Sequence, residues 1–285
     1  MILNNSIQLA CPLDGQAMSL QQRRFVCANG HSFDVARQGY LHLLPVQQKR
    51  SKFPGDSVEM IEARQRFLTA GFYDRIAEQL IKILRSNVQL NHDSCLLDAG
   101  CGEGFYLQRL YEVLAEDNVQ SGLVGLDISK AAILAAARRN KNITWLVASN
   151  KQPPLMPGSV DVIVCMFGFP VFDAFKKILK PGGKLLLIEA GPQHLIELRR
   201  IIYKEIKQPA GLPDLSAAEQ LGFELLVEEE LLYQTATLGQ QQIADLLLMT
   251  PHMFRASQEG KQRAAELDKI ELTVDISLRL LQLYS

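Results

Sequence analysis

Short apolar runs alternate with amphipathic stretches through the middle of the chain. Each run is bounded by glycine, proline or polar residues, which is typical of strands that are buried on both faces. We expect such strands at 94–97, 122–126, 143–148, 160–166 and 184–189. Helical spacing follows the first two, in Leu107, Leu110, Tyr111 and Leu114 and in an alanine-rich stretch at 131–137 that Ser129 can cap. This alternation predicts an α/β fold with a parallel, doubly wound sheet.

Two further helices are expected before the first strand, and one strand at the end of the chain. From Ser57 the pattern predicts a helix that buries Met60, Ile61, Phe67 and Leu68 and turns Glu59, Glu62, Arg64 and Arg66 outward. Gly71 ends it before a second helix at about 73–84. Apolar and polar residues alternate strictly over 271–280, which predicts a half-buried strand closing the edge of the sheet.

A turn rich in glycine follows the first strand. Asp98 ends the apolar run, and Gly100, Gly102 and Gly104 come at alternate positions before the helical pattern starts. Glycines let the backbone bend sharply and let a ligand lie where a Cβ atom would intrude. The sequence therefore predicts a ligand-binding turn between a strand and a helix, with Asp98 beside it. The alternative is a tight turn whose glycines serve packing alone.

A second acid favours the ligand-binding interpretation. Asp127 ends the second strand, where a carboxylate can accept hydrogen bonds from both hydroxyls of a ribose. Dinucleotide sites use the spacing G-x-G-x-x-G and place a pyrophosphate on the helix, whereas an acid beside this turn would repel phosphate. The pattern indicates the cationic nucleoside S-adenosylmethionine.

The loop after the fourth strand lies where such sheets bind their substrates. It carries Phe167 and Phe169, which can either pack in the core or stack on a substrate. No general base stands out. Glu189 and His194 are the nearest candidates by position, and packing or cofactor contact is the other interpretation of each.

Composition and charge indicate where the protein is located and what it can bind. The chain has 285 residues, is 47% hydrophobic and has a net charge of -1. It contains no apolar run of the roughly 20 residues that cross a bilayer, and its start lacks signal-peptide features, so we expect a cytoplasmic protein without a membrane partner. Five scattered cysteines favour reduced thiols or metal ligands. Residues 1–55 carry an excess of basic side chains, which can contact phosphates or form a solvated face.

Four residues near the N-terminus have the character of a metal site. Cys27 and His31 are spaced as a zinc-ligand pair, and Cys11 and Asp14 form a second pair in which a carboxylate stands where a thiolate is usual. Oxygen is the harder ligand, so weaker zinc binding is expected. Alternatively, both cysteines are small core residues and His31 is a core histidine.

Several motifs along nearly the whole chain resemble those of the bacterial 23S rRNA guanine-N1 methyltransferases, a family that includes macrolide-resistance enzymes. The motifs are Cys-Pro-Leu at 11–13, Gly-His-Ser-Phe-Asp at 30–34, the run from Gly39 to Ser57, the glycine turn, Gly-Pro-x-His-Leu at 191–195 and Met-Thr-Pro at 249–251. The resemblance implies a class I S-adenosylmethionine-dependent methyltransferase, with a seven-stranded, mostly parallel Rossmann-like sheet and an N-terminal zinc-ribbon-like module that recognises RNA.

The resemblance also implies residue roles. Tyr73, Gly102, Glu103 and His194 match positions that contact the cofactor, beside Asp98, Gly100, Gly104 and Asp127 from the pattern above. Cys11, Cys27 and His31 match zinc ligands, while Asp14 replaces a family cysteine. The expected substrate is N1 of a guanine in a 23S rRNA hairpin, and the expected assembly is a homodimer. Residues 166–173 are more apolar than the family's Tyr/Phe-Ala-Pro pattern.

We therefore expect an RNA-recognition module at 1–50, a connection at 51–55 and a catalytic domain within 51–285. Two other functions fit the sequence. One is methylation of a small molecule, for which the N-terminal module and the basic residues at 47–52 would have no purpose. The other is a non-catalytic RNA-binding protein that has retained the methyltransferase fold and lost the activity.

Overall fold

Helices cover both faces of a central sheet whose inner strands are apolar on both sides. The computed structural model describes residues 4–48, 54–206 and 211–284. The sheet has the order β10-β13-β9-β8-β5-β6-β7-β4. Its strands are β4 (Tyr40–His42), β5 (Cys95–Ala99), β6 (Gly122–Asp127), β7 (Thr144–Val147), β8 (Val160–Met166), β9 (Leu179–Ala190), β10 (Phe223–Gln234) and β13 (Thr273–Leu283). The strands from β9 to β4 are parallel, and β13 and β10 run antiparallel, so the expected α/β class is confirmed.

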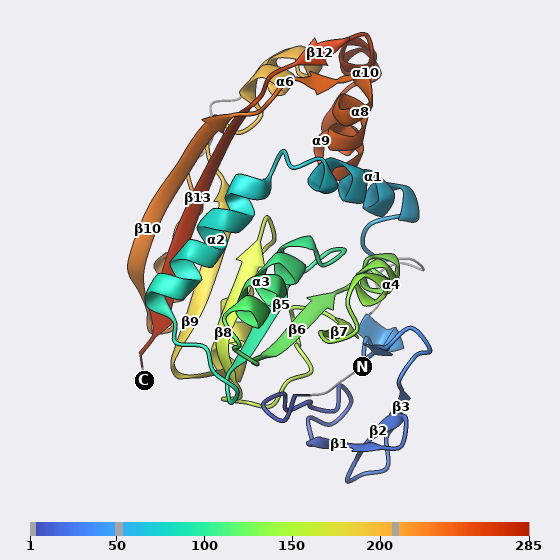
Figure 1. The fold of residues 1–285 in the computed structure, drawn as a ribbon, viewed down its shortest axis with the longest axis vertical. Helices are drawn as coiled ribbons and strands as arrows, with labels where there is room; N and C mark the ends of the chain where they lie inside the picture. The colour runs from blue at the N-terminus through green and yellow to red at the C-terminus, as the bar shows by residue number, and fades with distance from the viewer. Residues whose placement is uncertain (1–3, 49–53, 207–210, 285) are drawn as a thin grey trace.

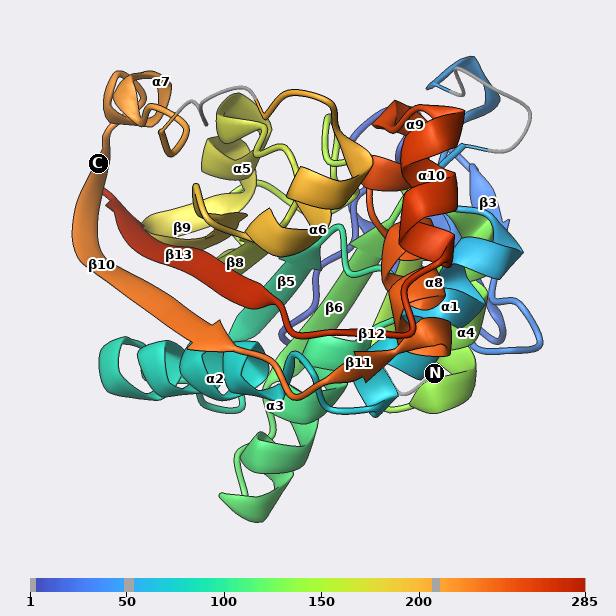
Figure 2. The ribbon, with the colours of Figure 1, turned by 90° about the horizontal axis from the view of Figure 1, so that it is seen from above.

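The helices form a layer on each side of this sheet. The larger ones are α1 (Val58–Thr69), α2 (Asp74–Asn87), α3 (Phe105–Glu116), α4 (Lys130–Arg139), α5 (Phe172–Ile178), α6 (Ile196–Ile202), α8 (Gln240–Met249) and α10 (Gln258–Ala265). The shorter ones are a 3-10 turn at Val46–Gln48, α7 (Ser216–Glu219) and α9 (His252–Arg255). Figure 2 shows α2 and α3 below the sheet and α5 and α7 above it. Two buried apolar clusters accordingly fill the two sides of the sheet.

The C-terminal part of the sheet differs from the prediction in two ways. The strand expected at the edge, β13, lies between β9 and β10, so β10 forms the edge. β13 is also buried on both faces rather than on one, because its residues contribute to the apolar clusters on both sides of the sheet, and β9 and β10 pair with its edges. Its polar residues Asp275, Ser277 and Arg279 are therefore in the interior. The alternation of apolar and polar residues predicted that one face of this strand is exposed to solvent, and that prediction is wrong.

The sheet has eight strands rather than seven, because the N-terminal part of the chain supplies one. β4 pairs in parallel with β7, with Tyr40 opposite Trp145. The sequence did not predict β4, because a strand of 3 residues is too short to show an alternation of apolar and polar positions. Residues 51–53 of the expected connection lie outside the described residues. The division at residue 50 stays a prediction, but a strand from before it is part of the central sheet.

The N-terminal module is a small antiparallel sheet that rests on the main one. Its strands are β1 (Met18–Gln21), β2 (Arg24–Cys27) and β3 (Ser32–Asp34). Leu9 bridges to Leu155, and Phe25 is buried in the apolar cluster that also contains residues of the main sheet. We call β1–β3 and the turns between them the ribbon. Core packing therefore holds the ribbon against the rest of the protein.

At one end of the molecule, α8 packs against α1, α9 and α10 (Figure 1). α1 packs on α8, and the Arg66 guanidinium binds both carboxylate oxygens of the buried Asp245, at 2.6 and 3.1 Å. A two-stranded sheet, β11 (Leu238–Gly239) with β12 (Lys269–Ile270), completes this end. In the described part of the chain, each helix is either too short or too polar to cross a membrane.

Candidate active site and metal centre

The glycine turn has the predicted geometry. β5 ends at Ala99 and α3 begins at Phe105, and the segment 98–104 is called the glycine bend below. Gly100, Gly102 and Gly104 have φ angles of 99°, 54° and 80°, in the left-handed region that favours glycine. A Cβ atom on Gly104 would lie 2.6 Å from Cη2 of Trp145, so packing also requires glycine there. The prediction of a strand, a tight bend and a helix is confirmed.

The two predicted acids meet at this bend. Asp98 is buried, and burial together with the neighbouring Asp127 raises the pKa of its carboxyl to about 7. The Asp127 carboxylate accepts from the backbone N–H of Gly102 at 3.0 Å and from that of Ser129 at 2.7 Å. Each carboxylate oxygen has two lone pairs, so both retain the capacity to accept from a ligand. The bend thus brings together the two acidic side chains that the sequence predicted for a nucleoside site.

Several polar atoms near the bend are buried and have no partner in the described structure. Glu103 is buried and pairs with Arg139, yet its Oε1 atom and the Arg139 Nε have none. The Tyr106 hydroxyl and the Asn150 Oδ1 atom are also buried without a hydrogen-bond partner in the described structure. Nδ2 of Asn150 donates to the Ala99 carbonyl. Unsatisfied buried polar atoms are costly and mark sites where a ligand completes the hydrogen bonding. These atoms fit a ligand with both donors and acceptors, as S-adenosylmethionine has.

The other two residues implied by the resemblance lie together at the end of β9. The Tyr73 hydroxyl lies 3.3 Å from Nε2 of His194, and the backbone N–H of Asp275 donates to Nδ1 at 3.4 Å. Nδ1 is then the acceptor, which assigns the proton to Nε2. Burial lowers the pKa of His194 to about 4, so the ring is neutral at physiological pH. His194 and Tyr73 form a second polar cluster, whereas Glu103 pairs with Arg139.

Phe167 extends this second cluster toward solvent. Its ring stacks against His194 with centroids 6.1 Å apart, and 44% of the residue is exposed. Its φ angle is 50°, a strained conformation for a non-glycine residue, and its N–H donates to the Ile188 carbonyl. Phe169 is 88% exposed. The core-packing interpretation of both rings is therefore wrong, and they are available to stack on a substrate.

Neither candidate base is suited to that role. The Glu189 carboxylate is buried and bound by Nε and Nη2 of Arg279, with the Nε contact at 3.1 Å. That ion pair joins β9 to β13 and uses the carboxylate for structure. His194, with its lowered pKa, is a weak base at neutral pH.

Arg64 is a site residue that the sequence pattern misplaced. It was expected to face outward, but its guanidinium pairs with Asp56 at 2.6 Å and lies against Gly102 of the glycine bend. Arg64 comes three residues after the buried Ile61 and three before the buried Phe67, so it is on the apolar side of α1. That spacing was the available signal, and the charge of the side chain concealed it.

The four proposed metal ligands come together in the ribbon. Nδ1 of His31 lies 3.5 Å from the sulfur of Cys11, 3.5 Å from that of Cys27 and 3.0 Å from an oxygen of Asp14. All four ligand atoms lie within 4.8 Å of one another. Two thiols, an imidazole and a carboxylate are a ligand set that suits tetrahedral zinc. Cys11 and Cys27 are buried, as the core-residue alternative also expects, whereas the His31 side chain is partly exposed. The cluster is compatible with Zn²⁺.

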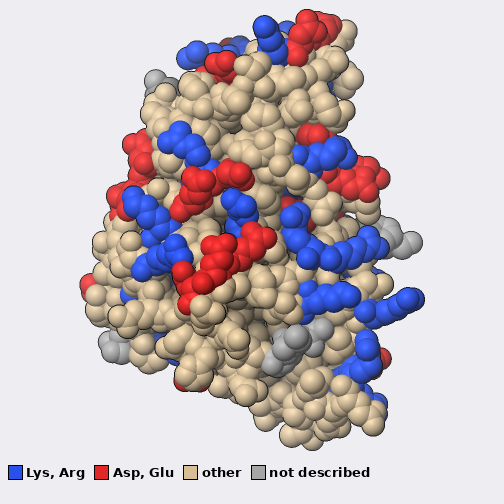
Figure 3. Space-filling view, in the orientation of Figure 1, with Lys and Arg blue, Asp and Glu red and all other residues tan. Residues whose placement is uncertain are grey.

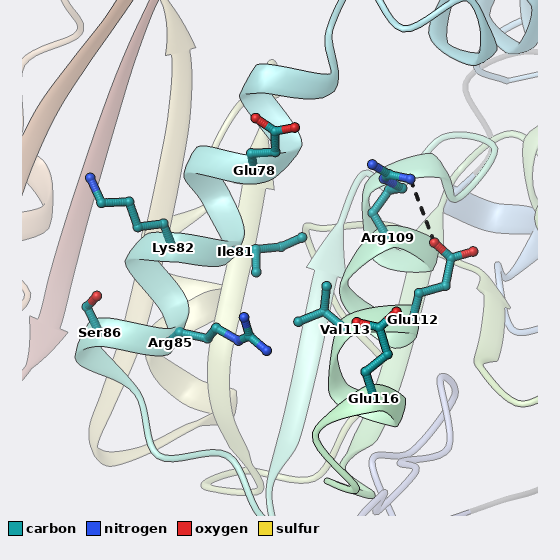
Figure 4. Close-up of a pocket in the computed structure, with 9 residues that line it drawn as sticks. All are labelled: Glu78, Ile81, Lys82, Arg85, Ser86, Arg109, Glu112, Val113 and Glu116. Carbon is teal, nitrogen blue, oxygen red and sulfur yellow. Dashed lines mark ion pairs between the residues drawn. The ribbon is translucent and has the colours of Figure 1, made fainter.

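A groove on the surface lies away from these residues. It measures about 570 Å³ between α2 and α3 and is lined by Glu78, Ile81, Lys82, Arg85, Ser86, Arg109, Glu112, Val113 and Glu116 (Figure 4). We call it the α2–α3 groove. Its three cations face three carboxylates, and Arg109 pairs with Glu112 at 4.0 Å. None of the bend residues lines it, so its size does not mark the site of the chemistry.

Comparison with known proteins decides the family. The family described as RlmA, N-terminal matches residues 9–52, and a methyltransferase domain matches residues 96–183. A 23S rRNA (guanine(748)-N(1))-methyltransferase from Streptomyces fradiae is 32% identical over 274 residues, 94% of both chains. This chain belongs to the 23S rRNA (guanine-N1)-methyltransferase family. The resemblance found in the sequence motifs is thereby confirmed, as is the S-adenosylmethionine-dependent methyltransferase fold.

The chain is also similar to other methyltransferases. YxjB of Bacillus subtilis, provisionally named as a 23S rRNA (guanine-N(1)-)-methyltransferase, is 29% identical over 94% of both chains. UbiE of Wigglesworthia glossinidia brevipalpis, a ubiquinone/menaquinone biosynthesis C-methyltransferase, is 31% identical but covers 40% of this chain and 49% of that protein. A solved complex of the Haloferax volcanii Trm112 methyltransferase activator with a provisionally named methyltransferase gives a TM-score of 0.50 at 18% identity, over 81% of this chain and 99% of the other. That likeness concerns the fold.

Proposed function

We propose that this protein transfers a methyl group from S-adenosylmethionine to N1 of a guanine in a hairpin of 23S rRNA. The observation that carries the proposal is the position of Phe167. Its ring joins the buried His194 cluster to an exposed aromatic surface at the end of β8. A guanine that has left the RNA stack can stack on such a ring. Unstacking the guanine costs a few kcal/mol, and this cost is smallest when the guanine lies in a loop.

The glycine bend supplies the residues proposed to hold the cofactor. Gly100, Gly102 and Gly104 would admit it close to the backbone, and Asp127 would accept from its ribose. Asp98, Glu103, Tyr73 and His194 would complete its polar surroundings. The bound sulfonium supplies an electrophilic methyl group, so the chain's own work is to align the guanine and exclude water. Because the pKa of His194 is lowered, its imidazole is uncharged at neutral pH and would not repel the cationic cofactor.

We propose that Cys11, Asp14, Cys27 and His31 hold one zinc ion that stabilises the ribbon. Burial raises the pKa of the Cys11 thiol to about 11, and a bound Zn²⁺ would favour its thiolate. A module this small has little core of its own, which supports a structural role for the metal.

Methyl transfer to RNA provides the direct test. Purified protein, S-adenosylmethionine and transcribed 23S rRNA hairpins should yield N1-methylguanine, detected by mass spectrometry of the digested RNA and by a reverse-transcription stop. Asp98→Ala should abolish cofactor binding in calorimetry and methylation with it. Cofactor binding without transfer to any RNA would favour a non-catalytic RNA-binding protein instead. Transfer to metabolites but not to RNA would favour a small-molecule methyltransferase.

The proposed function also bears on where the protein acts. A ribosomal RNA substrate supports a location in the bacterial cytoplasm. We also propose a homodimer, and a division into an RNA-recognition module at 1–50 and a catalytic domain at 51–285. Light scattering tests the first, and limited proteolysis tests the second.

A further inference from the structure

Arg64 brings a positive charge to a bend that carries acidic side chains. Its Nη1 atom lies 3.2 Å from the position that a Cβ atom on Gly102 would take, so the guanidinium rests on the glycine bend. Asp98 and Glu103 belong to the same bend, and Asp127 binds its backbone. Carboxylates attract a sulfonium and an ammonium, whereas a guanidinium repels both. The position of Arg64 therefore indicates that the ligand also carries an anionic group.

Part of the Arg64 guanidinium remains available to such a group. Its Nη2 atom lies 2.6 Å from the Asp56 carboxylate and donates to the Met249 carbonyl at 3.4 Å. Within the described part of the chain, Nη1 and Nε make no hydrogen bond, so their N–H groups can donate to another acceptor. Arg139 also lies beside the bend, but its guanidinium binds the Glu103 carboxylate. Arg64 can therefore bind a ligand without giving up its partners.

Asp56 fixes the position of this guanidinium. The Ser129 hydroxyl donates to the Asp56 carbonyl at 2.8 Å, and the Ser129 N–H donates to the Asp127 carboxylate. A Cβ atom on Gly55 would lie 2.7 Å from that of Ser129, so the segment before α1 packs tightly on the residues that follow β6. Arg64 is therefore held in place before a ligand binds, which lowers the entropy cost of binding.

The electrostatics of the bend agree with an anionic group beside Arg64. Burial raises the pKa of the Glu103 and Asp127 carboxyls, and the Arg64 guanidinium counteracts this rise in both. The N-terminus of α3 adds positive potential, because its first turn has no acidic residue and its N-cap, Gly104, has no side chain to accept from the N–H groups. Arg64 and the start of α3 thus favour a negative charge at the same part of the bend.

S-adenosylmethionine contains one anionic group, the carboxylate of its methionine part, beside a cationic sulfonium and a cationic ammonium. A guanidinium donates charge-assisted hydrogen bonds to a carboxylate, and these are stronger than hydrogen bonds between neutral groups. We propose that Arg64 binds the carboxylate of the cofactor and selects ligands that carry this group. The inference rests on the proposed function, in which the cofactor occupies the glycine bend. Arg64 is then a residue that determines specificity for the cofactor and leaves the methyl group to others.

Calorimetric titration of the full-length protein with three related ligands tests this proposal. S-adenosylmethionine has all three charged groups, S-adenosylhomocysteine lacks the sulfonium, and decarboxylated S-adenosylmethionine lacks only the carboxylate. Arg64→Gln should bind the first two ligands at least about tenfold more weakly than the wild type, because hydrogen bonds between charged groups are lost. It should bind the decarboxylated ligand as tightly as the wild type or more tightly, since a repulsive charge has been removed.

Two further variants separate this role from a structural one. Arg64→Lys keeps the charge but not the planar fork of donors, so its loss for S-adenosylmethionine should be smaller than that of Arg64→Gln. Arg109→Gln removes the same charge from the α2–α3 groove, where Arg109 pairs with Glu112, and should bind all three ligands as the wild type does. Figure 3 shows Lys and Arg alternating with Asp and Glu over α2 and α3, so this control changes a balanced surface.

An equal loss for all three ligands in Arg64→Gln would show that Arg64 only supports the fold, and it would overturn the inference. Wild-type affinity for S-adenosylmethionine in that variant would overturn it too. Thermal unfolding without ligand shows whether each variant is folded. If Arg64→Gln does not fold, Arg64→Lys decides: a smaller preference for the carboxylate supports the inference, and an unchanged preference overturns it.

The assignment of Arg64 and the proposed function fail in different ways. If the wild type methylates the RNA hairpin while Arg64→Gln keeps the wild-type preference for the carboxylate, the assignment is wrong and the function stands. If Arg64→Gln loses that preference but the wild type methylates no RNA, the assignment stands and the proposed function is wrong.

Discussion

The Tyr73 hydroxyl lies 3.3 Å from Nε2 of His194, although 121 residues separate the two along the chain. Tyr73 is the N-cap of α2, and His194 lies in the turn between β9 and α6. Backbone from β13 fixes the other side of the imidazole through Asp275. The pair therefore joins three distant segments at the end of the sheet where the cofactor is proposed to bind.

Tyr73→Phe should weaken S-adenosylmethionine binding by about fivefold to tenfold. The substitution leaves the buried Nε2–H of His194 without its acceptor, and a hydrogen bond contributes about 1 kcal/mol net. Calorimetric titration of the cofactor measures the change. Tyr111→Phe is the control, since the Tyr111 hydroxyl accepts from Asn142 on an exposed part of the surface. Equal affinity in Tyr73→Phe and the wild type would show that the pair does not shape the cofactor site.

Asp98→Asn should stabilise the free protein at pH 8 and weaken its binding of S-adenosylmethionine. The pKa of Asp98 is about 7 in the folded protein, above the 3.8 of an unperturbed aspartate. A raised pKa contributes stability that is complete below pH 3.8 and is lost as the pH rises through 7. At pH 8 the buried charge therefore costs stability, by a few kcal/mol at about 1.4 kcal/mol per pKa unit, and asparagine removes that cost.

Urea denaturation without the cofactor would measure this effect at pH 8 and at pH 4. The variant's advantage should be largest at pH 8 and nearly absent at pH 4, where the wild-type carboxyl is protonated in the folded state. A variant that is less stable at pH 8, or equally tight binding of the cofactor, would contradict the assignment of Asp98.

Asp14→Cys should make the ribbon hold zinc more tightly. A thiolate is a softer ligand than a carboxylate, and the four ligand atoms already lie within 4.8 Å of one another. Zinc release to a coloured chelator should be at least tenfold slower than in the wild type. Asp34→Cys adds a cysteine to the same ribbon outside the cluster and should not change the rate. Equal release from all three proteins would argue against Asp14 as a ligand.

Phe169→Ala should lower methylation of RNA without affecting stability or cofactor affinity. The ring is 88% exposed, so its removal should change the free energy of unfolding by less than about 0.5 kcal/mol. Loss of a base-stacking surface costs about 1–3 kcal/mol, which corresponds to a decrease of at least fivefold in kcat/KM for the hairpin. Leu226→Ala, at an exposed position of β10, is the matched control. A wild-type rate would mean that the ring does not contact the RNA.

The sequence alone determined the parallel core and the bend within it. The strands at 94–97, 122–126, 143–148 and 160–166 were predicted nearly at their observed bounds, because strands buried on both faces must be continuously apolar. Gly100, Gly102 and Gly104 predicted a sharp bend between strand and helix, because glycine allows backbone conformations that other residues rarely adopt, and the observed φ angles are positive at all three. Cys11, Asp14, Cys27 and His31 were also predicted to come together, from the spacing of the two residues within each pair.

The tertiary structure alone decided what depends on contacts between distant segments. Arg64 faces the bend because Asp56 pairs with it there, and nothing in the helical pattern encodes that partner. β13 is an interior strand because β10 covers its edge, and β4 joins the main sheet although its length is too short to show a period.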